Sequence, residues 1–232
     1  MKIGLLLNFD NSVVENLQTK LPSHKIVTLD PKSETIFEKV ADIDILIGAN
    51  ASDELIESAA NLKLFHVPWV GLDRINFPAL QKKNVIICNS KWNDRLVAEY
   101  ALTLLLTSLK HLIPIHNDFI QGSWKLRPTS SRLLFGSNVL LIGFGSIGHE
   151  LAKLLQPFTK NILALRNNPE KSTAEEHELV KKIIGWDNYF EVIQDIDYVI
   201  VSLPLTPNTE AILSKERLQS MKEGTILVNV GR

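Results

Sequence analysis

Short apolar runs that do not alternate with polar residues recur along the chain, and they constrain its fold more than any other feature. The first series is KIGLLL, KIVTL, DILIG, LKLFHV and VIIC, at residues 2–7, 25–29, 44–48, 62–67 and 85–88. Each run precedes a polar or helix-like segment. Because continuous apolar runs are typical of parallel strands covered on both faces, this half of the chain is predicted to be α/β.

A second series of the same kind follows. It comprises NVLLIG, NILAL, YVIVSL and TILVNV at residues 138–143, 161–165, 198–203 and 225–230, with a weaker candidate, KIIGW, at 182–186. Two doubly wound parallel-sheet domains in succession are the simplest account, and a chain of 232 residues is long enough for both. We expect the first domain over residues 1–95 and the second over residues 96–232.

A helix is predicted between the two series, over residues 93–110. Its helically spaced residues are Val97, Tyr100, Ala101, Leu104, Leu105, Ser108 and Leu109, and Leu96, Leu102 and Leu106 make its other sides apolar. Either Asn93 or Asp94 would cap its N-terminus. A helix that is apolar nearly all round must be covered, and a core helix and a dimer helix explain this equally well. A homodimer is the expected assembly.

Charge and composition exclude some partners. The formal net charge is −1, with no block of like charge that would follow a nucleic acid backbone or an anionic membrane. The most apolar later stretch, residues 96–109, is too short to span a bilayer and contains Glu99. The single cysteine, Cys88, cannot form an intramolecular disulfide, and it is more simply a packed strand thiol than a nucleophile. We expect a cytoplasmic protein without a metal site.

A glycine pattern follows the first strand of the second series. Gly143, Gly145 and Gly148 form G-x-G-x-x-G, after an apolar strand and before a segment with one apolar helical face. Such glycines permit a tight turn, an approach of the backbone to a pyrophosphate, and close packing of helix on sheet. The phosphates would lie at the helix N-terminus, at Ser146 and Ile147. Three glycines could also simply make a turn, but their context favours dinucleotide binding.

The residue after the next strand predicts the type of dinucleotide. An acidic residue usually binds the ribose hydroxyls there, but this chain has Arg166, followed by Asn167 and Asn168. Arginine can pair with a 2′-phosphate, and this favours NADP over NAD. Alternatively, Arg166 is a solvated residue at the strand end, and either cofactor binds.

The chain resembles a known family from about Val70 to Arg232. The similarity is strongest in GFGSIGHELA and in DIDYVIVSLPLTPNTEAILSKERLQSMKEGTILVNVGR, residues 195–232. These segments resemble the D-isomer-specific 2-hydroxyacid dehydrogenases, which include phosphoglycerate, glyoxylate/hydroxypyruvate, D-lactate and formate dehydrogenases. The resemblance implies a flavodoxin-like substrate domain, a connecting helix and a Rossmann nucleotide-binding domain.

The resemblance also implies roles for the loops of the second domain. The loop with Leu203, Pro204 and Thr209 would cover the nicotinamide side of the cofactor, and Val230 and Gly231 are assigned to the same site. This loop also follows a central strand, where ligands of open α/β sheets bind. A proline-rich turn in which Thr209 caps the next helix is the alternative.

Substrate contacts are implied in the first domain. The backbone N–H groups of Val70 and Gly71 would hold a substrate carboxylate, although a structural turn also explains WVGLD. Asn93 matches an asparagine that contacts substrate in formate dehydrogenases, although helix capping explains it equally well.

Arg232 is the candidate catalytic residue. A guanidinium can grip a carboxylate or 2-oxo acid through two hydrogen bonds, and the resemblance identifies Arg232 as the family's catalytic arginine. The family's general-acid histidine and its orienting carboxylate lie downstream, so we expect the natural chain to continue past Arg232 and the second domain to be incomplete. Of the six histidines, only His66 lies near a candidate substrate loop, and it is a weak candidate. The other histidines, His149 among them, are expected at the surface or as caps.

These features predict an oxidoreductase that transfers a hydride between NAD(P)(H) and a small 2-hydroxy or 2-oxo acid, such as glyoxylate, hydroxypyruvate or phosphoglycerate. The alternative is a dinucleotide-sensing or scaffold protein of the same fold that has lost the reaction. A methyltransferase is disfavoured, because such enzymes also need an acid where this chain has Arg166.

Overall fold

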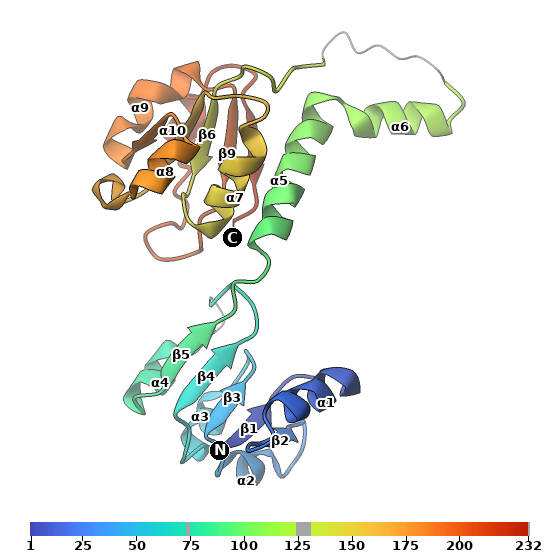
Figure 1. Cartoon of the computed structure of the whole chain (residues 1–232), viewed down its shortest axis with the longest axis vertical. Helices are drawn as coiled ribbons and strands as arrows, with labels where there is room; N and C mark the ends of the chain where they lie inside the picture. The colour runs from blue at the N-terminus through green and yellow to red at the C-terminus, as the bar shows by residue number, and fades with distance from the viewer. Residues whose placement is uncertain (73–74, 124–130, 232) are drawn as a thin grey trace. The chain divides into compact units, whose positions relative to one another are not determined.

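The computed structural model describes residues 1–72, 75–123 and 131–231 (Figure 1). The chain divides into two compact units, Met1–Trp92 and Asn93–Arg232. The boundary expected from the sequence lies after residue 95 instead. The difference arises because helix α5 (Asp94–Leu109) packs on helix α7 (Ser146–Leu155) and strand β10 (Ile226–Asn229), and so belongs to the second unit from its first turn.

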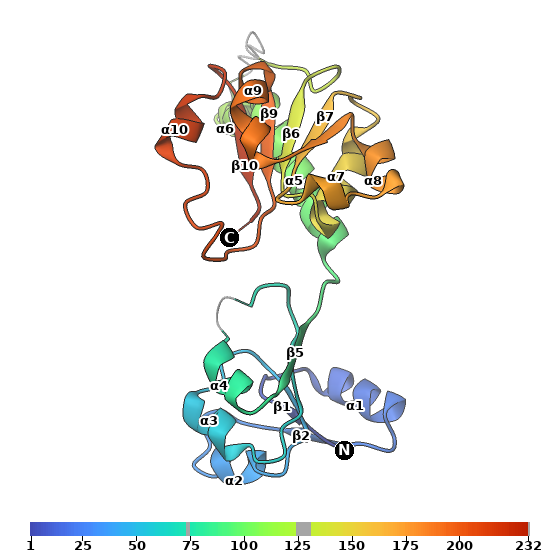
Figure 2. The ribbon, with the colours of Figure 1, turned by 90° about the vertical axis from the view of Figure 1, so that its left-hand side faces the viewer.

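The first unit is a parallel sheet with strand order β2-β1-β3-β4-β5. Its strands are β1 (Lys2–Leu5), β2 (Lys25–Thr28), β3 (Ile45–Ile47), β4 (Leu64–Val67) and β5 (Ile86–Asn89), and its helices are α1 (Asn11–Lys20), α2 (Ile36–Val40), α3 (Asp53–Ser58) and α4 (Phe77–Lys82). Helices α2, α3 and α4 lie on one side of the sheet and α1 on the other (Figure 2). This order is the flavodoxin-like one, as predicted.

The second unit is also a parallel sheet, with strand order β10-β9-β6-β7-β8. Its strands before β10 are β6 (Val139–Ile142), β7 (Ile162–Leu165), β8 (Lys182–Ile184) and β9 (Tyr198–Val201). The helices besides α5 and α7 are α6 (Leu112–Ile120), α8 (Ala174–Leu179), α9 (Tyr189–Val192) and α10 (Lys215–Gln219), with 3-10 turns at Pro169–Lys171, Trp186–Asn188 and Ile193–Asp195. The first strand of the unit lies centrally, as in one half of a Rossmann fold, so this prediction is confirmed.

The central strands of the second unit are buried on both faces, which explains their unbroken apolar sequence. Val139 and Leu141 face the core under α5 and α7, whereas Leu140 and Ile142 face a second core that includes Tyr189 of α9. Every residue of β6 and β9 is buried. Apolar side chains on both faces of these strands therefore fix the sheet between two helical layers.

Helix α5 forms over the predicted range, and its N-cap is Asn93, one of the two predicted residues. The Asn93 side chain, however, makes no capping hydrogen bond. Ala98, Ala101 and Leu105 are fully buried, while Leu96 remains 63% exposed. The rest of the fold therefore covers only one side of this helix.

No single described helix has both the length and the apolar composition to cross a membrane. Only α5 and α6 together, which meet at a 65° bend, would reach those limits.

Candidate functional site

The glycine loop after β6 depends on the absence of side chains at two positions. Gly143 has φ +98°, and a Cβ there would lie 3.1 Å from the Ser202 backbone. A Cβ on Gly148 would lie 2.5 Å from the carbonyl oxygen of Gly143. Gly143 therefore permits the turn, and Gly148 lets α7 approach the loop, as the sequence predicts.

Gly145 differs from these two glycines because it has open space around it. It is the N-cap of α7, and among the described residues no side chain caps that helix end and no atom beyond its chain neighbours lies within 4 Å of the Cβ position. Ser146 and Ile147 form the first turn, whose N–H groups have no acceptor within the helix. Open space at an uncapped helix N-terminus fits an anionic group, so the chain's own residues fit the pyrophosphate of a dinucleotide.

The loops after β6, β9 and β10 contact one another at the carboxyl edge of the sheet. The Gly143 Cβ position lies 3.1 Å from Leu203 Cδ2, and that of Gly231 lies 2.5 Å from the Leu203 carbonyl oxygen. The Val230 backbone N–H donates to the Val201 carbonyl at 2.9 Å. Residues predicted for the cofactor site from separate strands thus lie together, at the edge where open α/β sheets bind ligands.

Thr209 closes the loop that follows β9. Its Oγ1 donates to the Pro204 carbonyl at 2.5 Å and accepts from the Thr206 backbone N–H at 2.8 Å. The alternative prediction, that Thr209 caps the next helix, is wrong. Helix α10 begins at Lys215 and is capped by Ser214, because Ala211 has a left-handed φ of 51° that ends the turn before the helix starts.

Arg166 follows β7, and its side chain is already paired. Its Nη1 donates to both carboxylate oxygens of Glu176, at 3.0 and 3.1 Å. Glu176 belongs to α8, where it forms a capping box with Thr173. A T-x-x-E pattern at Thr173–Glu176 is the sequence signal for this helix start, but it does not show that Glu176 pairs with Arg166.

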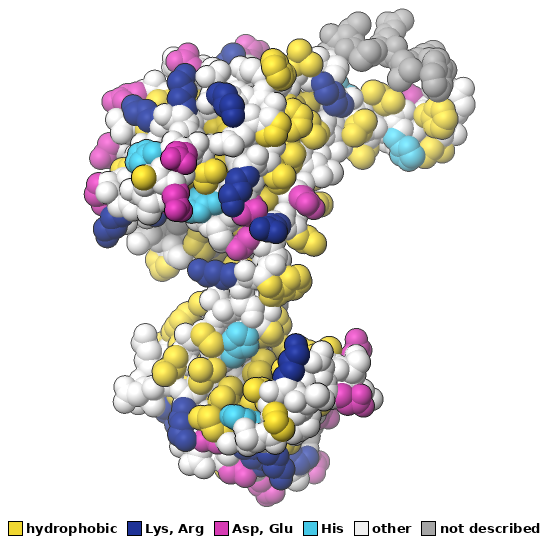
Figure 3. Space-filling view, in the orientation of Figure 1, with side chains coloured by type: hydrophobic (Ala, Val, Ile, Leu, Met, Phe, Trp, Pro, Cys, Tyr) yellow, Lys and Arg dark blue, Asp and Glu magenta, His cyan; other side chains and the backbone are white. Residues whose placement is uncertain are grey.

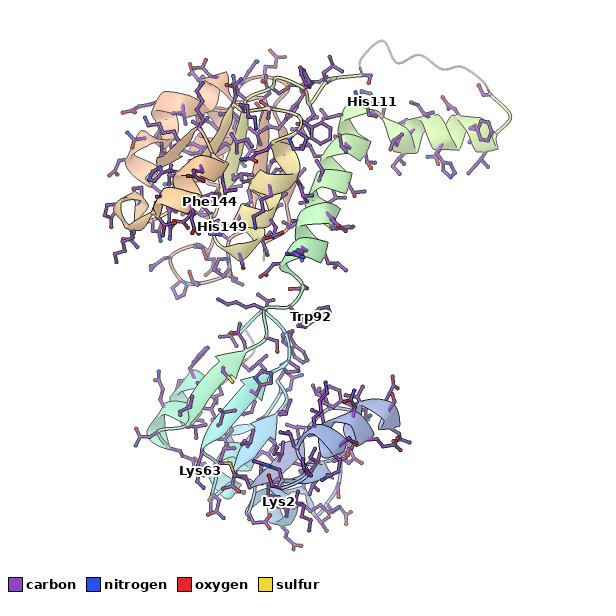
Figure 4. The ribbon with its side chains drawn as sticks, in the orientation of Figure 1. Lys2, Lys63, Trp92, His111, Phe144 and His149 are labelled. Carbon is purple, nitrogen blue, oxygen red and sulfur yellow. The ribbon has the colours of Figure 1, made fainter. Side chains whose placement is uncertain are left out.

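His149 of α7 shares this carboxylate. Its Nε2 lies 2.8 Å from Glu176 Oε1, and its ring meets Phe144 edge-on at 4.6 Å (Figure 4). His149 remains partly exposed, and α8 brings a carboxylate over α7 that contacts its ring, which the sequence does not predict. The pKa of Glu176 lies below its usual value, chiefly because the Thr173 backbone N–H donates to it; burial opposes this shift, and the charge of Arg166 reinforces it. Glu176 is thus ionised at neutral pH.

Asn167 is also engaged, since its Oδ1 accepts from Trp186 Nε1 at 2.9 Å. This hydrogen bond fixes the orientation of the Asn167 side chain at the strand end. Its remaining amide hydrogens can still be offered to a ligand.

In the first unit, the loop after β4 is held against the end of β5. Asn89 Nδ2 donates to the Val70 carbonyl at 2.8 Å, and Gly71 follows, partly exposed. His66 Nδ1 lies 3.1 Å from Cys88 Sγ, and His66 Nε2 lies 3.1 Å from Ser90 Oγ. Burial lowers the pKa of His66. No carboxylate contacts this ring within the described parts of the chain, so it lacks the orienting group of a general acid.

Asn93 and Asp94 each bury a side-chain oxygen, Oδ1, that has no hydrogen-bond partner among the described residues. A buried acceptor without a donor is unfavourable, and such groups are often ligand contacts. Arg232, the predicted catalytic residue, lies outside the described residues.

The second unit matches a known family. The model of the D-isomer specific 2-hydroxyacid dehydrogenase, NAD binding domain, matches residues 102–232. The chain is 28% identical to a hydroxypyruvate reductase of Thermotoga maritima over 87% of its length and 64% of the relative, and 31% identical to a glyoxylate reductase of Thermococcus onnurineus over 86% and 61%. It therefore spans less than two thirds of these curated relatives.

A solved structure supports the same assignment. The NAD-dependent formate dehydrogenase from Staphylococcus aureus, in complex with NAD, is 26% identical and superposes with a TM-score of 0.78 over 100% of this chain and 74% of that one. With more than half of its residues matched by the family model, the chain belongs to the D-isomer specific 2-hydroxyacid dehydrogenase family.

Proposed function

We propose that the protein is an NAD(P)-dependent oxidoreductase that acts on a small 2-hydroxy or 2-oxo acid such as glyoxylate, hydroxypyruvate or phosphoglycerate. The observation that carries this proposal is the uncapped N-terminus of α7. It has open space at Gly145, between two glycines whose Cβ positions are blocked. A simple turn would not need this combination, whereas a pyrophosphate site does.

Different residues of the second unit would bind the pyrophosphate and the nicotinamide ring of the cofactor. The backbone N–H groups at Gly145, Ser146 and Ile147 would hold the pyrophosphate. The segments Leu203–Pro204 and Val230–Gly231, with the turn closed by Thr209, would border the nicotinamide ring, which supplies or accepts the hydride when bound.

The resemblance assigns substrate binding to Val70, Gly71, Asn93 and Arg232. The backbone N–H groups of Val70 and Gly71 and the guanidinium of Arg232 would hold the carboxylate, and Arg232 would also polarise the 2-oxo group. Asn93 would contribute its buried Oδ1, which lacks a donor. These roles rest on the resemblance and on general chemistry.

The cofactor proposed here is NADP(H) in preference to NAD(H). Its support is the guanidinium of Arg166 at the end of β7, where an acid would suit an unsubstituted ribose. NAD(H) also fits the glycine loop, so the preference concerns relative affinity.

A cytoplasmic homodimer is the proposed assembly. Hydrophobic side chains lie along the visible surface of α5 and α6 (Figure 3). Leu96 and Tyr100 of α5 and Leu112 and Ile113 of α6 are each about half exposed or more. A second copy of the chain would remove this apolar surface from water. The unpaired Cys88 fits a reducing compartment.

Steady-state kinetics test the proposed activity. Reduction of glyoxylate and of hydroxypyruvate is followed with NADPH and with NADH, in the full-length natural protein and in its Arg232→Gln variant. We expect turnover with at least one 2-oxo acid, faster with NADPH, and a loss in Arg232→Gln of at least about a hundredfold, the typical cost of a transition-state charge contact. Cofactor binding without reduction of any 2-oxo acid would contradict the enzyme and favour a dinucleotide-sensing protein.

A further inference from the structure

A three-residue ionic cluster lies at the strand end where a cofactor ribose would bind. Arg166 comes from the end of β7, Glu176 from α8 and His149 from α7. Glu176 is the centre, because it accepts from Arg166 Nη1 through both oxygens and its Oε1 also lies 2.8 Å from His149 Nε2. Its side chain is 12% exposed, against 27% for Arg166 and 30% for His149.

The pairing leaves part of the Arg166 guanidinium available. Only Nη1 has hydrogen-bond partners in the described part of the chain, namely Glu176 and, at 3.5 Å, Ser172 Oγ. The Nε and Nη2 groups can therefore still donate to a phosphate. The positive charge, however, is compensated by a carboxylate that is held ionised.

We propose that Glu176 limits the cofactor selectivity of this subsite by neutralising Arg166. This inference rests on the proposed dinucleotide function. A 2′-phosphate carries about −1.5 to −2 charges at neutral pH, so it gains less from a neutralised guanidinium and is repelled by the adjacent carboxylate. An unsubstituted ribose hydroxyl is not repelled, and it can donate a hydrogen bond to a carboxylate. Glu176 therefore disfavours NADP(H) relative to NAD(H), and the preference conferred by Arg166 stays small.

Glu176 has two opposing effects on phosphate binding, and their relative sizes decide whether removing its charge strengthens or weakens that binding. Glu176 also orients the guanidinium, so its removal would free one side chain and weaken phosphate binding by a few fold at most, as for other partly exposed pairs. Removing a negative charge within a few ångströms of a doubly charged phosphate strengthens binding by about tenfold or more at an intermediate dielectric. The charge effect is larger, so loss of the Glu176 charge should strengthen binding of the phosphate.

The test compares Glu176→Gln with Glu175→Gln. Glutamine keeps an oxygen that can accept from the Thr173 N–H, so the capping box survives. Glu175 lies in the same turn of α8 and is exposed, so its variant makes the same change of charge without touching Arg166. Calorimetric titrations use adenosine 2′,5′-bisphosphate and 5′-AMP, which differ only by the 2′-phosphate and need no turnover.

We expect Glu176→Gln to bind adenosine 2′,5′-bisphosphate about tenfold more tightly than the wild type, with binding of 5′-AMP changed less than about twofold. Glu175→Gln should bind both as the wild type does. Weaker or unchanged bisphosphate binding in Glu176→Gln, or equal shifts with both nucleotides, would overturn the role of Glu176 while leaving the proposed function intact. Failure of the wild type to bind either nucleotide would refute the proposed function, and this inference with it.

Discussion

Replacing Gly145 with alanine should weaken cofactor binding while leaving the free energy of unfolding nearly unchanged. The backbone there has φ −102° and ψ −157°, which alanine adopts without strain, and the added Cβ meets no atom within 4 Å. Reduced freedom of the unfolded chain stabilises such a variant by about 0.4–1 kcal/mol. Loss of a glycine N-cap costs about 0.5–1 kcal/mol. The two effects nearly cancel, so Gly145→Ala should unfold within about 1 kcal/mol of the wild type.

Gly148→Ala is the matched contrast, because its Cβ would lie 2.5 Å from the Gly143 carbonyl oxygen. Backbone cannot yield as a flexible side chain can, so we expect a loss of about 1–3 kcal/mol, typical of overpacked sites. For a unit of this size that lowers the melting temperature by about 3–10 °C.

Gly145→Ala, whose folding stability should hardly change, should nevertheless lose affinity for NADPH. If the pyrophosphate approaches Gly145, the methyl group lies between phosphate and the N–H groups of α7, and affinity for NADPH should fall at least about tenfold, or about 1.4 kcal/mol. Fluorescence titration with NADPH and a thermal melt of each variant measure both quantities. NADPH affinity of Gly145→Ala equal to that of the wild type would refute the assignment of this loop.

The remaining predictions concern charge and assembly. Arg166→Gln should weaken NADPH binding by about three- to tenfold, with little change for NADH, as measured by fluorescence titration; equal losses for both would contradict the ribose assignment. The lowered pKa of Glu176 means that its contribution to folding is present above pH 4.5, its unperturbed value, and disappears as the pH falls through the folded pKa. In urea unfolding, the free energies of unfolding of the wild type and Glu176→Gln should therefore converge as the pH falls below the folded pKa of Glu176. A difference between the two free energies that persists at such pH would contradict this role of the Glu176 charge. In light scattering the wild type should have twice the 26.1 kDa chain mass, and Leu96→Glu with Ile113→Glu should give the single mass; an unchanged mass would exclude this surface as the interface.

Strands were the most predictable part of this protein. All the predicted apolar runs form strands, including the weak candidate that became β8, because parallel strands buried on both faces leave an unbroken apolar signal. Their order followed from two doubly wound units, since few arrangements connect such strands without crossing.

Side-chain partners were less predictable. The sequence shows an arginine at position 166, but its pairing with Glu176 depends on how α8 lies over α7, which local sequence does not specify. The sequence also suggests Thr209 as a helix cap, whereas Ser214 caps α10, because the left-handed Ala211 separates Thr209 from the start of that helix.

The central claim is that the second unit binds a nicotinamide dinucleotide at the N-terminus of α7. Isothermal titration of NADPH into the purified 232-residue chain tests it most directly. The account predicts saturable binding of one NADPH per chain, weaker binding of NADH, and affinities for both that fall at least about tenfold in Gly145→Ala. No saturable binding of either dinucleotide to the folded wild-type chain would contradict it.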